Sequence, residues 1–212
     1  MTDATSGDPF DPSAPAPDVA GGVAAVILAA GRATRFGGPK VLARVAARPL
    51  LAHAIAAARA AGLPAHVVVP TDGTAAEAIA AAVAAAGAVV VPAPDSAAGQ
   101  RASLRRGLTG LPAGTAAAVV LLGDQPGIDP VVVRALVAAW RDEPTTAWRA
   151  RYADGPGHPV LLPAALWPAV QAAADADVGA RDLLADVGVR ELAVAGPAPR
   201  DVDRPEDLPG SA

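Results

Sequence analysis

The amino-acid sequence predicts a three-layer α/β domain with a mostly parallel, mixed sheet and helices on both faces. Short apolar runs of strand length alternate with segments of helix length along the chain, and this alternation is typical of a parallel sheet that helices cover on both sides. Two runs near the end, 145–152 and 158–162, follow each other closely, which makes the predicted sheet mixed. A chain of 212 residues is long enough to bury the core of one such domain.

Each predicted element has its own signal. Residues 23–28 and 117–122 are apolar throughout, as expected for strands buried on both faces. Gly62 ends the first predicted helix, Thr74 with Glu77 forms a capping box for the second, and Asp129 before a proline begins a later one. The predicted strands are 23–28, 65–69, 88–91, 117–122, 145–152, 158–162 and 189–194. The predicted helices are 50–61, 74–86, 99–111, 129–140, 161–173 and 179–187.

The composition excludes several classes of protein. A net charge of −4 argues against general nucleic-acid binding, which usually needs a clear basic excess. The chain has no cysteine, so it has no disulfide framework and no thiolate metal site or nucleophile. The positive charges gather instead at 32–48 and 101–106, as expected for a protein that binds a small anion.

The two ends of the chain are predicted to lie outside the folded domain. Residues 1–20 hold several prolines and aspartates with few apolar residues, which is typical of a disordered leader and unlike a signal peptide. Residues 209–212 are predicted to be a disordered tail. Apolar stretches of membrane-spanning length are interrupted by Gly, Pro or charge. We therefore expect one domain at 21–208 in a cytoplasmic protein with no membrane partner.

A glycine-rich, basic loop follows the first strand. Glycines let the backbone approach a ligand closely, and the free N–H groups of such a loop can cradle an anion. Three cations in the same loop point to the phosphates of a nucleotide, with a plain turn as the alternative. Because five residues separate its first two glycines and a valine follows its lysine, the loop is not a P-loop. The loop residues are Gly31, Arg32, Arg35, Gly37, Gly38 and Lys40.

Residues 28–40, LAAGRATRFGGPK, resemble the LAAGxSxRxGxPK signature of nucleotidyltransferases with a pyrophosphorylase-type α/β domain. Within them, the likeness is closest to the molybdenum cofactor cytidylyltransferases. The resemblance implies a Rossmann-like nucleotidyltransferase domain in which Arg35 and Lys40 are catalytic groups that neutralise the triphosphate. The nucleotide-binding residues that it implies are Leu28, Ala29, Ala30, Gly31, Arg32 and Gly37.

Two acidic segments are candidates for a metal site. Gly123-Asp124-Gln125-Pro126 follows an apolar strand, where an aspartate can hold Mg²⁺ against phosphate oxygens, although a plain turn explains the same residues. The segment resembles the family's metal-binding motif, which implies Asp124 as a catalytic metal ligand. Residues 201–208, DVDRPEDL, resemble the D-x-D-T-P-E-D-L element of these transferases, with Arg204 in place of threonine. This implies Asp203 as the second Mg²⁺ carboxylate, with helix capping as the alternative.

Three further residues complete the expected site. Ser103 matches a serine that related cytidylyltransferases use near the base, although serine is also favoured at the start of a helix. His158 stands in a Gly-His-Pro-Val loop that resembles the acceptor side of the family, with a structural role as the alternative. Arg181 stands in a Gly-Ala-Arg-x-Leu-Leu segment that resembles one in the molybdenum cofactor enzymes, which implies a second acceptor-side residue, with a salt bridge to Asp182 or Asp186 as the alternative.

The resemblance implies that the protein transfers CMP from CTP to a phosphorylated acceptor, molybdopterin, and releases pyrophosphate with Mg²⁺ as its cofactor. GTP with molybdopterin, or CTP with a sugar or polyol phosphate, are the alternatives within the same fold. An alternative of a different class is a non-catalytic chaperone that carries the molybdenum cofactor to a client molybdoenzyme. Release of pyrophosphate on mixing triphosphate and acceptor separates the last alternative from the others.

Overall fold

The computed structural model describes residues 22–31, 36–173 and 188–208. The strands are β1 (Val23–Leu28), β2 (Arg44–Val45), β3 (Arg48–Pro49), β4 (Ala65–Pro70), β5 (Val89–Ala93), β6 (Ala117–Leu122), β7 (Trp148–Tyr152), β8 (Gly155–Pro163) and β9 (Arg190–Ala193). The α-helices are α1 (Leu50–Ala60), α2 (Ala76–Ala85), α3 (Gln100–Thr109), α4 (Pro130–Asp142) and α5 (Trp167–Ala173). The 3₁₀ turns are η1 (Lys40–Leu42), η2 (Ser96–Ala98), η3 (Ala164–Leu166) and η4 (Pro205–Asp207).

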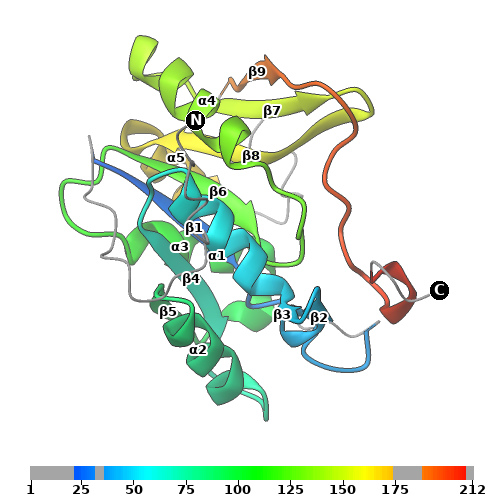
Figure 1. Ribbon diagram of the computed structural model, residues 1–212. Helices are drawn as coiled ribbons and strands as arrows, with labels where there is room; N and C mark the ends of the chain where they lie inside the picture. Colours follow the sequence, from blue (N-terminus) through cyan, green and yellow to red (C-terminus); the bar gives the residue numbers. More distant parts are fainter. Residues whose placement is uncertain (1–21, 32–35, 174–187, 209–212) are drawn as a thin grey trace, which may run out of the picture.

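Seven of the strands form one sheet in the order β5-β4-β1-β6-β8-β7-β9 (Figure 1). β8 runs antiparallel to both of its neighbours, β6 and β7, and the other pairs are parallel. β2 and β3 form a separate two-stranded hairpin. The predicted α/β fold with a mostly parallel, mixed sheet is therefore confirmed.

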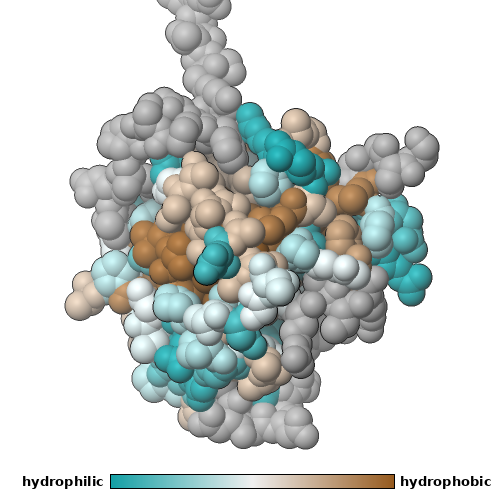
Figure 2. All heavy atoms as spheres, turned by 90° about the horizontal axis from the view of Figure 1, so that it is seen from below, coloured by the Kyte–Doolittle hydropathy of each residue, from teal (hydrophilic) through white to brown (hydrophobic). Residues whose placement is uncertain are grey.

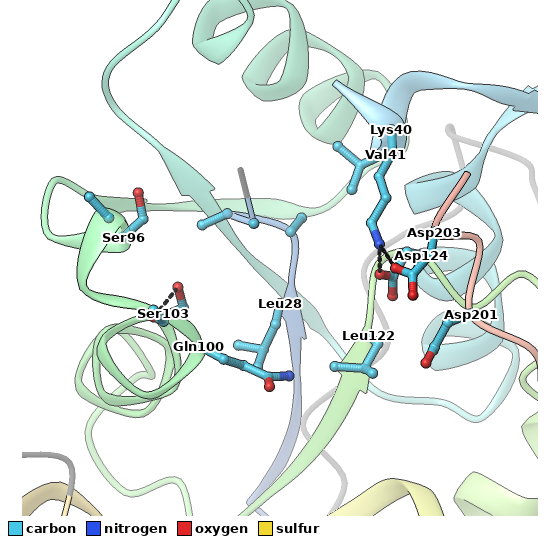
Figure 3. Close-up of a pocket in the computed structure, with 15 residues that line it drawn as sticks. Leu28, Lys40, Val41, Ser96, Gln100, Ser103, Leu122, Asp124, Asp201 and Asp203 are labelled. Carbon is cyan, nitrogen blue, oxygen red and sulfur yellow. Dashed lines mark hydrogen bonds and ion pairs between the residues drawn. The ribbon is translucent and has the colours of Figure 1, made fainter. Parts of the chain in front are cut away.

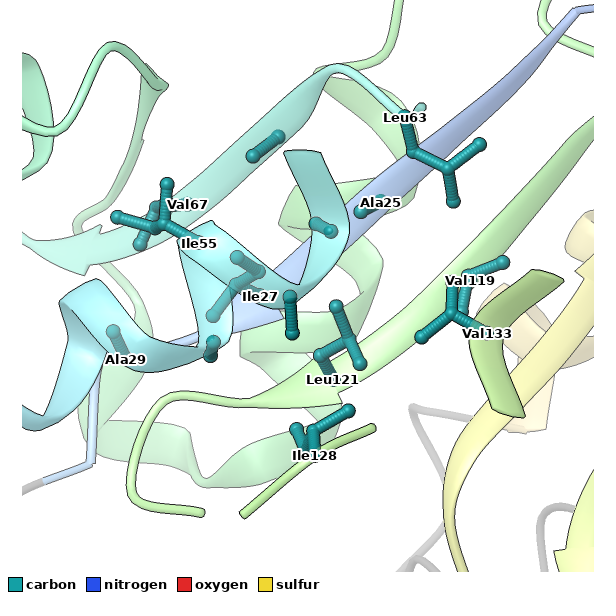
Figure 4. Packing of buried hydrophobic residues seen from close by; sticks show 14 of the residues in the cluster. Ala25, Ile27, Ala29, Ile55, Leu63, Val67, Val119, Leu121, Ile128 and Val133 are labelled. Carbon is teal, nitrogen blue, oxygen red and sulfur yellow. The ribbon is translucent and has the colours of Figure 1, made fainter. Parts of the chain in front are cut away.

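Helices cover the sheet on both faces, which gives three layers. On one face, α1, α2 and α4 pack on strand residues such as Ile27, Val67 and Leu121 (Figure 4). On the other face, α3 and α5 pack on strand residues such as Val26 and Val120. Neighbouring residues of β1 point to opposite faces and are both buried. This is why the strand is apolar throughout rather than alternating.

The strand order reverses between β1 and β6. From β1 the chain runs to β4 and β5 on one side of the sheet and then returns to β6 on the other side. β1 and β6 pair in register from Val23 with Ala117 to Leu28 with Leu122, so the two strands end side by side. In an open α/β sheet, ligands bind in the crevice that such a reversal leaves at the carboxyl ends of the strands.

α3 lies very close to the sheet because Gly107 has no side chain. A Cβ at this position would lie 2.4 Å from Val26 Cγ1 and 3.0 Å from Val68 Cγ2. We expect Gly107→Ala to lower the free energy of unfolding by about 1–3 kcal/mol, because overpacking a dense core outweighs the better helix propensity of alanine. Urea unfolding measures this, with Gly38→Ala as the control, since a Cβ at position 38 would meet no atom of the described residues within 4 Å. A stabilised Gly107→Ala protein would contradict the close packing.

The structure departs from the sequence-based prediction at two helices, α2 and α5. α2 begins at Ala76 after a residue with no side-chain cap, so the predicted capping box of Thr74 with Glu77 is wrong. β8 continues to Pro163, so Leu161 and Leu162 belong to a strand and the helix predicted at 161–173 begins only at Trp167. At α4 the prediction is confirmed, because Asp129 Oδ1 accepts a hydrogen bond of 2.7 Å from the N–H of Val131. The helix predicted at 179–187, the leader and the tail lie outside the described residues.

Most large hydrophobic side chains of the described residues are buried, while Val89 and Val131 are more than half exposed. On the face seen in Figure 2, hydrophobic residues gather near the centre among polar ones. None of the helices in the described part of the chain is both long enough and apolar enough to cross a bilayer.

Candidate functional site

A cleft of about 540 Å³ opens at the carboxyl ends of β1 and β6. Three parts of the chain meet there: the segment after β1, the loop that leads into α3, and the end of β6 together with the C-terminal segment (Figure 3). Leu28 and Leu122, the last residues of the two strands, lie between a carboxylate-rich end and an end lined by serines. The lining residues are Leu28, Ala29, Ala30, Gly31, Lys40, Val41, Ser96, Ala97, Gly99, Gln100, Ser103, Leu122, Asp124, Asp201 and Asp203.

The segment after β1 forms one wall of the cleft. Of the predicted nucleotide-binding residues, Leu28, Ala29, Ala30 and Gly31 line it. The N–H of Ala29 donates to Val68 O at 3.0 Å, which ties the segment to β4. A Cβ on Gly31 or Gly37 would meet no atom within 4 Å, so the described surroundings leave open space at both glycines. Gly37 does not line the cleft, and Arg32 and Arg35 lie outside the described residues.

Lys40 joins the two predicted metal carboxylates. Its Nζ lies 2.6 Å from Asp124 Oδ2 and 2.9 Å from Asp203 Oδ1 (Figure 3). Burial lowers the pKa of Lys40, but the hydrogen bonds and charges of the two carboxylates outweigh it, so its pKa is raised above the ordinary value. Lys40 is therefore a cation at neutral pH, held between two anions at the mouth of the cleft.

Asp124 is brought to the segment after β1 by the glycine that precedes it. The N–H of Gly123 donates to Leu28 O at 3.0 Å. A Cβ on Gly123 would lie 3.1 Å from Leu28 O and 3.2 Å from Ala29 Cβ, so a larger residue would push the two strand ends apart. The Asp124 side chain is 20% exposed and faces the cleft.

The C-terminal segment returns from β9, at the edge of the sheet, to the end of β6 (Figure 1). Val202 is buried, and its N–H donates to Asp124 O at 3.1 Å. Gln125 Nε2 donates to Asp201 Oδ1 at 2.8 Å. These contacts bring Asp203 opposite Asp124. Burial raises the pKa of Asp201; the Gln125 hydrogen bond opposes this shift, and the neighbouring carboxylates add to it.

The donor set at this end of the cleft fits a Mg²⁺ ion that binds together with phosphate. Asp124 and Asp203 each have an oxygen within 2.9 Å of one cationic nitrogen, so a single positive charge already bridges them. Mg²⁺ usually takes one or two carboxylates plus substrate phosphates and water. No group of three or more His, Cys, Asp or Glu side chains within the described ranges is arranged to hold a metal.

The opposite end of the cleft lies at the start of α3. Ser103 is buried, and its hydroxyl donates to Gly99 O at 3.4 Å. Ser96 and Gln100 lie at the same end, across Leu28 from the carboxylates (Figure 3). Asp95 fixes this loop to the helix, because its carboxylate accepts from Arg105 at 2.9 Å and from Arg106 at 3.0 Å.

The two predicted acceptor-side residues are not both within the described chain. β8 pairs with β6 as far as Val160 with Val120, so His158, two residues before Val160, lies beside the carboxyl end of β6. Tyr152 Oη donates to His158 O at 2.9 Å. Burial lowers the pKa of His158 to about 4, and the nearby carboxylate of Asp124 opposes this only in part. Arg181 lies outside the described residues.

The depressed pKa of His158 predicts acid lability. Between pH 6.5 and about 4 the unfolded chain binds a proton at His158 and the folded chain does not, so stability is fully present above pH 6.5 and is lost as the pH falls. We expect a loss of about 1–3 kcal/mol between pH 7 and pH 4 that His158→Asn largely removes. Urea unfolding at several pH values measures it. An equal loss in His158→Asn would contradict the assignment.

Several cleft residues were not predicted from the sequence. Asp201 lines the cleft, and Gln125 donates a hydrogen bond to it. Both belong to the acidic motifs already described, so their places next to Asp203 and Asp124 in the sequence were a usable signal. The residues just before α3 and at its first position carried no signal, because small and polar residues are common where a loop leads into a helix. They are Ser96, Ala97, Gly99 and Gln100.

The comparisons with known proteins agree with this geometry. Residues 25–194 match the MobA-like NTP transferase domain. The structure of Rv0371c from Mycobacterium tuberculosis H37Rv has 33% sequence identity and a TM-score of 0.74, over 87% of this chain and 94% of that chain. Its homologue from Mycobacterium sp. strain JC1 has 31% identity and a TM-score of 0.75, over 87% and 92%. Rv0371c in complex with manganese has 33% identity and a TM-score of 0.73, over 87% and 94%.

A more distant neighbour shows the fold alone. CMP:2-keto-3-deoxy-manno-octonic acid synthetase complexed with CTP has 16% identity and a TM-score of 0.72, over 87% of this chain and 94% of that chain. No curated protein matches the chain in sequence. Because the family match spans most of the chain and agrees with the solved structures, the chain belongs to the MobA-like NTP transferase family and is a nucleotidyltransferase.

Proposed function

We propose that this nucleotidyltransferase moves CMP from CTP to a phosphate oxygen of molybdopterin and releases pyrophosphate, with Mg²⁺ bound in the cleft. The observation that carries the proposal is the convergence of Lys40, Asp124 and Asp203 at the mouth of the cleft, with both carboxylates within 2.9 Å of the lysine nitrogen. A cation flanked by two metal-binding anions suits a triphosphate that arrives with a divalent metal.

The reaction that we propose is a direct displacement at the α-phosphorus of the triphosphate. An oxygen of the acceptor phosphate forms a bond to that phosphorus. The bond from the phosphorus to the oxygen that bridges to the β-phosphate breaks, and its electron pair leaves with pyrophosphate. The protein has no bond to make, so its contribution is to position the two substrates and to neutralise charge.

Lys40 and the loop after β1 have the role of phosphate binding in this proposal. We assign the Lys40 ammonium to the leaving pyrophosphate, together with Arg35, and the backbone amides after β1 to the triphosphate oxygens. Arg32 and Gly37 belong to the same proposed loop site. The support is the placement of residues 28–31 along the cleft wall, next to Lys40.

Asp124 and Asp203 are the proposed metal ligands. The bound Mg²⁺ would neutralise phosphate charge and polarise the phosphoryl group. The two carboxylates would hold it at the end of the cleft where Lys40 also lies, and the Lys40 ammonium would then be available to the triphosphate. The manganese complex of Rv0371c, at 33% identity, supports a divalent ion in this fold.

The base is proposed to lie at the start of α3. Ser103, Ser96 and Gln100 line this end of the cleft, across Leu28 from the carboxylates (Figure 3). Cytosine is favoured by Ser103, in the setting used by related cytidylyltransferases. It is also favoured by the Ala29-Ala30 pair, because relatives that transfer GMP more often have Ala-Gly or Gly-Gly there. The pocket offers hydroxyl and amide groups that can pair with a base edge.

The acceptor is proposed to lie on the other side of Asp124, toward β8. His158 lies beside the end of β6, and a neutral imidazole can hydrogen-bond the phosphate or the pterin of the acceptor. Arg181 is proposed to bind the acceptor from the segment after α5. A client molybdoenzyme that receives the product is a further proposed partner.

A panel of the four nucleoside triphosphates against molybdopterin and against sugar and polyol phosphates tests the proposal through release of pyrophosphate. We expect CTP with molybdopterin to be used about tenfold better than GTP or more, which corresponds to about 1.4 kcal/mol and to one or two hydrogen bonds at the base edge. Preference for GTP would overturn the assignment of CTP as the substrate, but not the proposed nucleotidyl transfer. Turnover only with a sugar or polyol phosphate would overturn the acceptor.

The same panel separates an enzyme from a cofactor chaperone. A chaperone would bind molybdopterin without releasing pyrophosphate from any triphosphate. Binding is measured independently by fluorescence quenching of the pterin in the wild-type protein. Tight binding without turnover in all combinations would overturn the proposed transfer reaction.

A further inference from the structure

Asp203 reaches the cleft from a distant part of the sheet. The strand before it, β9, lies at the sheet edge, with β7 and β8 between it and β6. The C-terminal segment crosses the ends of these strands before it meets β6 (Figure 1). The position of the Asp203 carboxylate therefore depends on how the segment is fastened at the end of β6.

The fastening is made largely by the two residues that follow Gly123. Gln125, which is 6% exposed, donates from Nε2 to Asp201 Oδ1 at 2.8 Å and to Pro199 O at 3.4 Å. One residue after Asp201, Val202 is buried and its N–H donates to Asp124 O at 3.1 Å. The buried amide of Gln125 thus holds the segment on both sides of residue 200. It lies next in sequence to Asp124, the carboxylate that Asp203 must face.

Asp201 is oriented for this contact rather than for the metal. In Figure 3 its side chain points away from the group formed by Lys40, Asp124 and Asp203. A neutral amide donor satisfies the Asp201 carboxylate without adding charge to a cleft that already holds two other carboxylates. Asp203, in contrast, has a side chain that is 54% exposed and within 2.9 Å of Lys40 Nζ.

We propose that Gln125 is a positioning residue for the metal site, which through its hydrogen bond to Asp201 fastens the C-terminal segment so that Asp203 faces Asp124. The inference rests on the proposed function, because it assumes that Asp124 and Asp203 hold the metal. Residues that orient metal ligands commonly change metal affinity by about 10–100-fold when they are replaced. Gln125 touches neither metal nor substrate in this role.

Four proteins test the inference by reversing the polarity of the hydrogen bond: wild type, Gln125→Glu, Asp201→Asn, and the double variant. Gln125→Glu replaces the amide that donates to Asp201 with a carboxylate, which cannot donate and repels the Asp201 carboxylate. Asp201→Asn keeps an acceptor oxygen for Gln125. The double variant restores the pair, with the asparagine amide donating to the glutamate. Two readouts apply at pH 8 without nucleotide: Mn²⁺ affinity by electron paramagnetic resonance, and hydrogen exchange at the Val202 amide.

We expect Gln125→Glu to weaken Mn²⁺ binding about tenfold or more and to speed exchange at Val202. Asp201→Asn should stay within about threefold of wild type, and the double variant should recover most of both losses. Recovery in the double variant is the outcome that a general loss of stability does not produce. Unchanged Mn²⁺ affinity in Gln125→Glu, or no recovery in the double variant, would overturn the inference.

Gln125→Met covers the case in which the charged variant folds poorly. It removes the donor at similar volume, and Gln125 Oε1 is buried with no hydrogen-bond partner among the described residues, so the melting temperature should change little. Weakened Mn²⁺ binding at an unchanged melting temperature supports the positioning role. Gln171→Glu adds the same charge beside Thr109, at the far end of α3, and controls for net charge.

Two further variants separate this inference from the function on which it rests. Asp124→Asn should abolish tight Mn²⁺ binding if the proposed metal site is correct. If it does so while all Gln125 variants bind Mn²⁺ as the wild type does, only the positioning role fails. If Asp124→Asn binds Mn²⁺ normally, the proposed metal site fails, and the positioning role with it. A loss in Asp201→Asn as large as that in Asp124→Asn would make Asp201 a ligand and overturn the inference.

Discussion

Asp124→Asn should lower kcat by about 10²–10³-fold or more while the protein stays folded. The substitution keeps the shape of the side chain and removes one of the two proposed metal carboxylates. It also removes the anion that lies 2.6 Å from Lys40 Nζ. Asparagine fills the same space, and Asp203 still lies 2.9 Å from Lys40 Nζ, so the lysine keeps a counter-ion and we expect the fold to survive.

Pyrophosphate release at several Mg²⁺ concentrations measures the effect, and thermal melting checks the fold. The matched control is Asp129→Asn, five residues further on, because asparagine caps a helix as well as aspartate does. The control should keep wild-type activity and stability. If Asp124→Asn keeps activity within a factor of a few, or loses activity only because it no longer folds, Asp124 is not a metal ligand in the reaction.

The buried strands were the part of the fold that sequence predicted most closely. β1 and β6 begin and end at the residues predicted for them, Val23–Leu28 and Ala117–Leu122. Both lie in the centre of the sheet with helices on both faces, so an unbroken run of apolar residues marks the strand without any alternation. The reversal of strand order between them then places their following loops at one cleft.

The hairpin of β2 and β3 was missed because its turn has the wrong residues for a sequence signal. Ala46 and Ala47 adopt φ values of 47° and 63°, a conformation that normally calls for asparagine and glycine. The boundary between β8 and α5 was missed for another reason. Leu161 and Leu162 fit a buried strand and a buried helix equally well, and the pairing with β6 decides in favour of the strand.

The candidate site could be predicted only where a motif carried it. Lys40, Asp124 and Asp203 come from three separate motifs, and the structure places one oxygen of each aspartate within 2.9 Å of Lys40 Nζ. Gln125 and Asp201 stand in the same motifs as Asp124 and Asp203. The hydrogen bond between Gln125 and Asp201, however, depends on how the C-terminal segment crosses the sheet. Periodicity along the chain contains no information about such a contact. The catalytic roles of all these residues stay predictions.

Lys40→Met should lower kcat/KM for the triphosphate. The loss of transition-state stabilisation should be about 2–4 kcal/mol, the effect expected for removing one preorganised charge. Lys40 is the sole lysine of the chain, and its ammonium is within 2.9 Å of both Asp124 and Asp203. Methionine keeps the length of the side chain and removes the charge. Steady-state kinetics with CTP measure the loss, and Lys40→Arg, which keeps the charge, should retain more activity than Lys40→Met.

The same substitution should strengthen metal binding in the absence of nucleotide. With the ammonium removed, Asp124 and Asp203 face each other without a counter-ion, and a divalent ion no longer competes with Lys40 for them. We expect Mn²⁺ to bind Lys40→Met about tenfold more tightly than wild type, which is about 1.4 kcal/mol. A variant that loses activity while it gains metal affinity separates the charge of Lys40 from a general role in the fold, because misfolding weakens both. Weaker Mn²⁺ binding in Lys40→Met would mean that the lysine holds the two carboxylates in place, and it would contradict the idea that Lys40 leaves them for the triphosphate when the metal enters.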